Sequence, residues 1–140
     1  MKKKWSSKWK SSKSPRKQRN YIRYAPLHVK RKLIVGHLSK ELREKYKTRS
    51  IVIRKGDKVK VMRGKYKGTE GKVEKIFTKS LRVGLDSLKI TNKRGQKVYI
   101  KLRPSALLVT ELDLSDKYRL EKLNRLIELK SKAKQSTSTS

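Results

Sequence analysis

The sequence predicts a mainly β fold: a small barrel of short antiparallel strands, with a basic N-terminal extension that contains short helices and with a C-terminal helix. Two observations predict this class. Segments between residues 51 and 110 alternate apolar and polar side chains, with no long helical pattern between them. Four of the seven glycines also fall within sixteen residues of this region, where their backbone freedom suits tight turns between strands: Gly56, Gly64, Gly68 and Gly71.

Residues 1–24 are predicted to form a basic arm that contains aromatic side chains. No acidic residue precedes Glu41, and Lys, Ser, Arg and Gln dominate the segment. Because such a segment repels itself and has no apolar face, we expect it to stay disordered until a polyanion neutralises it. Its aromatic residues, Trp5, Trp9, Tyr21 and Tyr24, could stack on unpaired bases. For Trp5 and Trp9 the sequence leaves contact with a neighbouring protein equally open.

Residues 25–50 are predicted to form two short helices. Pro26 suits the first position of one helix, and Gly36 suits its stop. Ser39 is the predicted N-cap of the second helix, with Glu41 near the positive helix end. The basic run in the first helix is expected to face solvent.

Residues 51–110 are predicted to form the barrel, and each strand is marked by alternation. A hairpin turn is expected at residues 92–95, which read Asn-Lys-Arg-Gly. The alternation fails at residues 73–77, which indicates a bulge or a strong bend. The predicted strands cover residues 58–61, 81–86, 88–90, 98–102 and 106–109.

Residues 111–140 are predicted to form a helix over 113–133 and then a tail that frays from Gln135. Asp113 or Ser115 could cap this helix. One face is apolar and is expected to dock on another surface, so removal of the chain beyond Lys117 is expected to spare RNA binding. The apolar face comprises Leu120, Leu123, Leu126 and Ile127, with Tyr118 as a further member.

The net charge of +31 on 140 residues indicates a polyanionic partner. The charge is uneven: residues 1–50 hold 18 Lys and Arg against 2 acids, and residues 51–110 hold 17 against 4. Residues 111–140 hold only 7 against 5. The apolar face of the C-terminal helix is therefore expected to pack against a neighbouring protein or back on the barrel, while Lys130, Lys132 and Lys134 reach RNA.

The residues that catalysis needs are not grouped in this sequence. There is no cysteine, and His28 and His37 have no acid between them. No zinc-protease, redox, nucleophile-elbow or P-loop motif occurs. Asp57 beside Gly56 is expected to cap a turn rather than to bind a metal. We therefore expect no enzyme, no cofactor and no metal, and no apolar stretch approaches the ~20 residues of a membrane span.

The run from Lys55 to Val73, KGDKVKVMRGKYKGTEGKV, resembles the KOW motif. Further segments recur, in this order, in the archaeal and eukaryotic form of a universal large-subunit ribosomal protein family, number twenty-four (twenty-six in eukaryotes). The ordered set covers residues 15 to about 120 and is far more specific than KOW alone, which transcription factors also carry. The matching segments are residues 16–19, 25–32, 38–46, 49–50, 54–57, 104–105 and 112–114.

The resemblance implies an SH3-like barrel and a structural role in the large subunit of the cytoplasmic ribosome. It implies binding to the 5′ domain of large-subunit rRNA near the polypeptide exit tunnel, contacts with neighbouring ribosomal proteins, and support of early assembly. It implies no membrane and no small-molecule substrate. The chain departs from the family at Arg103, where a histidine is common, in its longer, Trp-containing residues 1–14, and in the Leu-rich helix 120–129.

The basic runs, the motif turn and the hairpin turn supply the candidate contacts with RNA. The candidate RNA-binding residues are Arg16, Lys17, Arg19, Arg23, Lys30, Arg31, Lys32, Arg49, Arg54, Lys55, Arg63, Lys65, Tyr66, Lys67, Gly68, Lys93 and Arg94, and the candidates for base stacking are Trp5, Trp9, Tyr21 and Tyr24.

Two other classes of protein share some of these features. A chromatin-type SH3-like barrel that coats duplex DNA would explain the charge and the barrel, but not fifty residues of basic, aromatic extension. A transcription elongation factor with a KOW motif carries a further α/β domain, for which 140 residues leave no room.

Overall fold

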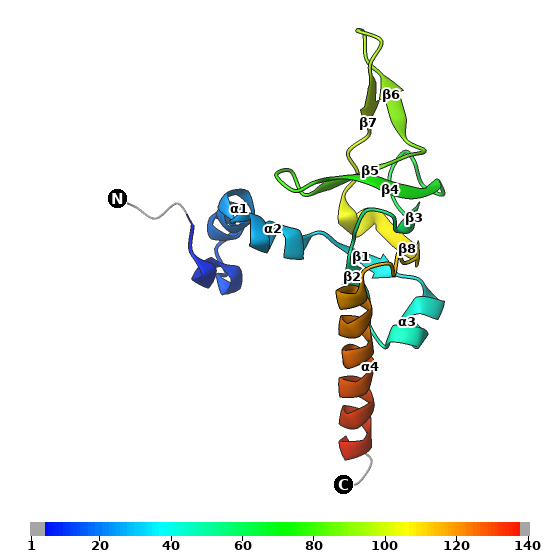
Figure 1. The fold of residues 1–140 in the computed structure, drawn as a ribbon. Helices are drawn as coiled ribbons and strands as arrows, with labels where there is room; N and C mark the ends of the chain where they lie inside the picture. The colour runs from blue at the N-terminus through cyan, green and yellow to red at the C-terminus, as the bar shows by residue number, and fades with distance from the viewer. Residues whose placement is uncertain (1–4, 138–140) are drawn as a thin grey trace.

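The computed structural model describes the backbone of residues 5–137 and the side chains of residues 5–129. A central sheet carries the N-terminal helices, a two-stranded hairpin and the C-terminal helix, which leave it in different directions (Figure 1). The elements in chain order are η1 (Ser7–Ser11), α1 (Pro15–Tyr24), α2 (Leu27–Leu33), β1 (Val35–Leu38), α3 (Lys40–Tyr46), β2 (Ser50–Val52), β3 (Lys58–Val61), β4 (Glu70–Phe77), β5 (Arg82–Leu85), β6 (Lys89–Thr91), β7 (Lys97–Tyr99), η2 (Pro104–Ala106), β8 (Leu107–Glu111) and α4 (Lys117–Thr137).

Six strands form one mixed sheet in the order β2-β1-β8-β3-β4-β5, and β6 pairs with β7. The mainly β class is confirmed, but the expectation that all strands pair antiparallel is wrong. The exception is β1, which runs parallel to β8 with His37 opposite Leu108 and Leu38 opposite Val109. The sequence did not indicate β1, because Gly36 weakens the strand signal in a segment of only four residues.

The other strand predictions are confirmed to within one or two residues, except that β7 ends at Tyr99 and not at residue 102, and the irregularity in β4 is confirmed as well. The register of β4 against β5 shifts between Val73 and Lys75, which is the bulge expected where the alternation fails. At the end of β6, Asn92 N–H donates to Gln96 O at 2.8 Å and so closes the predicted hairpin turn. The strand predicted from residue 106 is β8, which lies inside the sheet between β1 and β3.

The two helices predicted within residues 25–50 are α2 and α3. Ser39 caps α3 as predicted, since its Oγ accepts from Leu42 N–H at 3.4 Å. Pro26 lies one residue before the first helical residue. The predicted stop at Gly36 is wrong: α2 ends at Leu33, and Gly36 lies in β1, where a Cβ would come within 2.9 Å of the Ile53 side chain.

The hydrophobic core lies among the strands. The side chains that face it are buried, and those on the opposite face of each strand are more exposed. In β3, Val59 and Val61 are buried while Lys58 is exposed. This alternation is what the pleat of a strand produces when one face packs on the core. The core residues are Ile34, Leu38, Ile53, Val59, Val61, Val73, Val83, Leu85, Leu88, Leu107 and Val109.

The C-terminal helix α4 begins later than predicted. Asp116 caps it, because its carbonyl accepts from Arg119 N–H at 3.1 Å and its Oδ1 accepts from Tyr118 N–H at 3.0 Å. The predicted caps Asp113 and Ser115 are therefore wrong.

Leu123 is buried, as a docked apolar face requires, whereas Tyr118 is 81% exposed and does not belong to that face. The helix continues to Thr137, past the predicted fraying point at residue 135; residues 138–140 of the predicted tail lie outside the described part.

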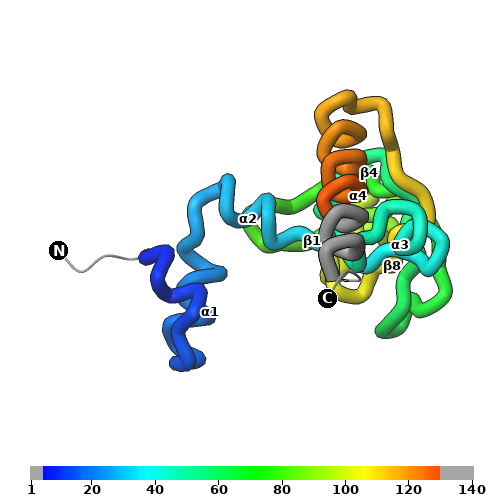
Figure 2. The backbone as a smooth tube through the Cα atoms, turned by 90° about the horizontal axis from the view of Figure 1, so that it is seen from below, coloured from blue at the N-terminus to red at the C-terminus, as the bar shows by residue number. Residues whose placement is uncertain are grey.

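The N-terminal arm differs from the expectation of a disordered segment, although its residues 1–4 lie outside the described part. Trp5 stacks on Tyr21 with 5.5 Å between ring centroids, and Trp5 Nε1 donates to Tyr21 O at 3.1 Å. Trp5 lies just before η1, so these contacts hold the segment that precedes η1 against α1. No residue of η1, α1 or α2 is buried, and Figures 1 and 2 show the arm extending sideways, away from the sheet.

Candidate nucleic-acid interface

The turn between β3 and β4 presents cations from a rigid backbone. Gly64 and Gly68 have φ values of +93° and +91°, which side chains with a Cβ rarely adopt. Gly68 N–H donates to Val61 O at 2.8 Å, and Lys67 N–H donates to Gly64 O at 3.1 Å. The turn is thus fixed by its own backbone. The side chains of Arg63, Lys65 and Lys67 project into solvent from it.

Tyr66 plays a different part from the cations beside it. Its side chain is half-buried and packs against the core. Tyr66 therefore anchors the turn to the sheet, and only its outer part is open to a ligand.

The turn before β3 is organised by Asp57, which is completely buried. Its Oδ2 accepts from Arg54 N–H at 2.8 Å, so the predicted turn cap is confirmed. Asp57 also binds Arg119 of α4 in a two-pronged ion pair, with Nη1 to Oδ1 at 2.6 Å and Nη2 to Oδ2 at 2.8 Å. Its Oδ1 further accepts from Asp113 N–H at 3.0 Å. The carboxylate is satisfied on every side, as a buried charge requires.

The sequence did not identify Arg119. A signal was present, because Arg119 lies four residues before Leu123 and so shares the face of α4 that docks on the sheet. A cation on a docking face needs a buried acceptor, but only the folded chain shows that the acceptor is Asp57, 62 residues away.

Two candidate contacts extend from this turn. Arg54 forms an ion pair with Asp116, and the guanidinium holds the pKa of the Asp116 carboxyl below its usual range. Half of the Arg54 side chain stays exposed. Lys55 is exposed at the turn, so this corner offers a guanidinium in a fixed position and an ammonium group beside it.

The β6–β7 hairpin places Lys93 and Arg94 at an exposed tip that projects away from the sheet (Figure 1). At its base, Lys89 Nζ lies 2.7 Å from Glu74 and 4.9 Å from the Tyr99 ring centroid. The hydrogen bond from Lys89 lowers the pKa of Glu74, and the Glu74 carboxylate raises the pKa of Tyr99. The base of the hairpin is thus tied to β4.

A further basic cluster near this base was not predicted. Lys75 and Lys101 both lie near the Phe77 ring, with their ammonium groups 5.6 and 5.2 Å from its centroid. Both lysines are exposed. The alternation of residues 98–102 could have placed Lys101 on an outer face, but the partnership with β4 is a tertiary contact.

The arm carries most of the remaining candidates on its two helices. Tyr24 is 44% exposed, with the Arg23 guanidinium 5.4 Å from its ring centroid. Lys30 Nζ donates to Arg23 O at 2.9 Å and so links α2 to α1. Trp5 and Tyr21 contact each other, and Trp9 is half-buried. The cations that are exposed are Arg16, Lys17, Arg19, Arg23, Arg31 and Lys32, and Arg49 is exposed just before β2.

The candidate residues lie on separate projections and not in a single cleft. The arm, the β3–β4 turn and the β6–β7 hairpin each present cations to solvent. Within the described residues no group of three His, Asp or Glu side chains could hold a metal. Among the helices described, none is long and apolar enough to cross a membrane. Such a surface suits a partner with many separated negative charges.

Comparison with known proteins identifies the family of the chain. The family of eukaryotic ribosomal proteins L26 and archaeal ribosomal proteins L24 matches residues 12–126. The chain is 43% identical over 116 residues to the large ribosomal subunit protein uL24 of Methanosphaera stadtmanae, and the match covers 83% of this chain and 99% of that protein. On this evidence the chain belongs to the family that comprises the ribosomal proteins L26 of eukaryotes and L24 of archaea.

Proposed function

We propose that this chain is a structural, non-catalytic constituent of the large subunit of the cytoplasmic ribosome and that it binds large-subunit rRNA and neighbouring ribosomal proteins. The observation that carries the proposal is the continuous family match over residues 12–126. This range includes about half of the basic arm, both basic turns and the first half of α4. The relative that is 43% identical is named for the same subunit.

The mode of binding follows from the exposed cations. Residues 1–24 act as an RNA-binding arm, and the candidate cations of the turns neutralise phosphates. Tyr24 is a stacking candidate with an open ring, at 44% exposure. Trp5 and Tyr21 form a joint platform, because each already covers one face of the other.

The place of binding is the 5′ domain of the rRNA near the polypeptide exit tunnel, where the chain supports early assembly. This part of the proposal rests on the resemblance of the KOW run and the ordered segments around it. An early binder must fold without the finished particle. The compact core of the sheet is consistent with that requirement.

The sheet is proposed to close as an SH3-like barrel. In support, residues of β3, β4, β5 and β8 share one core, and the bulge in β4 bends the sheet. An isolated bridge between Val83 and Leu102 brings the chain after β7 back to β5. Superposition of the sheet on known SH3-like barrels tests this closure.

Two measurements test the function. A tagged chain is expected to sediment with the large subunit and to appear in its early precursors. In gel shifts at matched salt, the purified protein is expected to bind a 5′-domain rRNA fragment more tightly than random duplex DNA of equal length. Equal affinity for both would favour the chromatin-type alternative, and exclusion from the large subunit would overturn the proposal.

A further inference from the structure

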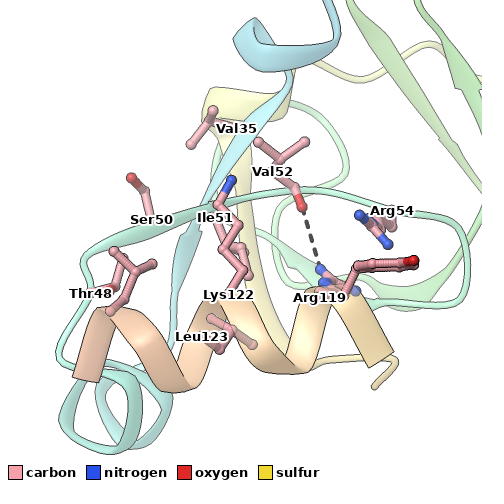
Figure 3. Close-up of a pocket in the computed structure, with 11 residues that line it drawn as sticks. Val35, Thr48, Ser50, Ile51, Val52, Arg54, Arg119, Lys122 and Leu123 are labelled. Atoms are coloured by element: carbon pink, nitrogen blue, oxygen red, sulfur yellow. Dashed lines mark hydrogen bonds between the residues drawn. The ribbon is translucent and has the colours of Figure 1, made fainter. Parts of the chain in front are cut away.

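The groove between strand β2 and helix α4 is not accounted for by rRNA binding. Figure 3 shows strand side chains on one side of the groove and α4 on the other. Its volume is about 340 Å³, at the lower end of the ~300–1,000 Å³ of ligand pockets. It has room for one or two side chains but not for a further strand or helix. The apolar lining comes from Val35, Ile51, Val52, Leu123 and Leu126.

Arg119 defines one end of the groove. Its Nη2 donates to Val52 O at 3.3 Å, across the edge of β2 (Figure 3). Because Arg119 is also held by Asp57, the two walls cannot separate easily. The groove is therefore a fixed feature of the fold and not a gap between loosely packed elements.

The groove continues onto the outer face of α4. A second hollow is lined by Glu121, Arg125 and Leu129, and it shares Tyr118, Lys122 and Leu126 with the first. Tyr118 is 81% exposed and Leu129 is 56% exposed. The apolar members of this hollow, Tyr118, Leu126 and Leu129, lie along one side of α4 among charged neighbours, and exposed apolar side chains grouped in this way favour an interaction site.

The charges around this surface distinguish it from the RNA-binding projections. Lys122 and Arg125 are exposed at its rim. Glu121 lies beside them, however, and residues 111–140 hold only 7 cations against 5 acids. An apolar centre with a few cations at the rim is typical of a protein interface. A phosphate backbone would instead favour a denser, uncompensated positive surface.

We propose that the groove between β2 and α4, with the adjoining face at Tyr118, Lys122 and Arg125, binds a neighbouring ribosomal protein through an apolar side chain flanked by carboxylates. The apolar side chain enters between Val52 and Leu126, and the carboxylates face Lys122 and Arg125. This inference rests on the proposed place of the chain in the large subunit. It assigns the C-terminal helix to a protein partner of stated chemistry.

The test is site-specific photo-cross-linking in assembled particles. Affinity capture is unsuitable, because a chain of net charge +31 retains many acidic proteins without specificity. The full-length chain carries benzoylphenylalanine at Tyr118, whose exposure makes the substitution harmless to folding. The matched control carries it at Asn124, which is exposed and lies on another side of α4. Co-sedimentation of the unsubstituted chain is established first, so that failure of the proposed function is detected separately.

The expected product is a cross-link from Tyr118, and not from Asn124, to a ribosomal protein segment in which Asp or Glu flanks an apolar residue. The double variant Lys122→Glu/Arg125→Glu should lower the yield at least about fivefold in particles that contain equal amounts of the chain, because like charges then meet. Lys97→Glu, at an exposed position on β7 and away from α4, should leave the yield unchanged. A cross-link to rRNA, no cross-link above the Asn124 control, or a protein cross-link that survives the double charge reversal would each overturn the inference.

Discussion

Arg119 of α4 donates hydrogen bonds to the carboxylate of Asp57 from both terminal guanidinium nitrogens, and both side chains are almost completely buried. Asp57 belongs to the KOW run, and the same carboxylate fixes the backbone of Arg54 in the turn before β3. The buried carboxylate of Asp57 thus connects the KOW run to the C-terminal helix. Because the tail completes this polar centre, it is an integral part of the domain and not an appendage to it.

The first prediction concerns the energetic value of this pair. Arg119→Ala leaves the Asp57 carboxylate buried without its counter-charge, so the free energy of unfolding should fall by about 3–5 kcal/mol. Asp57→Ala should cost a similar amount. Urea denaturation of each variant, followed by far-ultraviolet circular dichroism, measures both values.

The double variant supplies the control. Asp57→Ala combined with Arg119→Ala removes both charges, so its loss should be clearly smaller than the sum of the two single losses. Lys58→Ala removes an exposed partner of Glu111 and should change stability little. Additive losses in the double variant would mean that the two side chains act independently.

The Asp57–Arg119 pair also marks the limit of what the sequence could predict. Alternation placed Val59 and Val61 inside and exposed their neighbours, because that pattern is local to one strand. The capping role of Asp57 was equally local. Its partner was not predictable, since an arginine on a helix is usually exposed and the two residues lie 62 positions apart.

The arm and strand β1 are two further features that the sequence did not predict correctly. The disorder expected for residues 1–24 followed from composition, which does not reveal that Trp5 can stack on Tyr21. Strand β1 is held by β2 and β8 and not by its own propensity. The exposed cations of the turns were predictable because charge and exposure usually go together. Their arrangement as separate projections required the fold.

The second prediction concerns truncation and replaces the expectation that removal beyond Lys117 spares RNA binding. A chain that ends at Lys117 lacks Arg119 and Leu123, so it loses the ion pair and a buried apolar contact. It should unfold at a markedly lower temperature and bind rRNA poorly. A chain that ends at Leu129 keeps both and should melt close to the full-length protein. Thermal denaturation of both chains decides the matter, and a stable chain ending at Lys117 would show that α4 is dispensable.

The third prediction concerns Gly68. Nothing lies within 4 Å of the position that a Cβ would occupy there, so only the φ of +91° opposes substitution. Gly68→Val should destabilise the domain by about 1–3 kcal/mol through backbone strain. Gly68→Asn should cost less, because asparagine tolerates positive φ better. Chemical denaturation compares the two, and an equal cost would indicate that strain is not the cause.

The fourth prediction concerns acid. The Arg54 guanidinium lowers the pKa of Asp116 in the folded chain, so this carboxyl binds fewer protons in the folded chain than in the unfolded one. Its contribution is therefore present above the ordinary aspartate pKa of 3.8 and is lost as the pH falls through the lower, folded value. The Arg54→Gln variant should lose part of the pH dependence of the melting temperature below about pH 4. An unchanged pH profile in that variant would contradict the coupling. Both proteins in this comparison keep Arg119, so the buried ion pair with Asp57 is the same in the two.

The last prediction concerns the cations of the β3–β4 turn. Lys65 and Lys67 are exposed on a turn fixed by its own backbone, so replacing either with alanine should leave the fold intact. If each neutralises one phosphate of the rRNA fragment, each substitution should lower the slope of log affinity against log salt by about one. Lys60→Ala is the matched control, since Lys60 Nζ is already paired with Glu70 at 2.9 Å and should contribute less to the slope. Fluorescence anisotropy over a range of salt concentrations measures all three variants. Slopes that match the unsubstituted protein would show that neither Lys65 nor Lys67 neutralises a phosphate of the fragment.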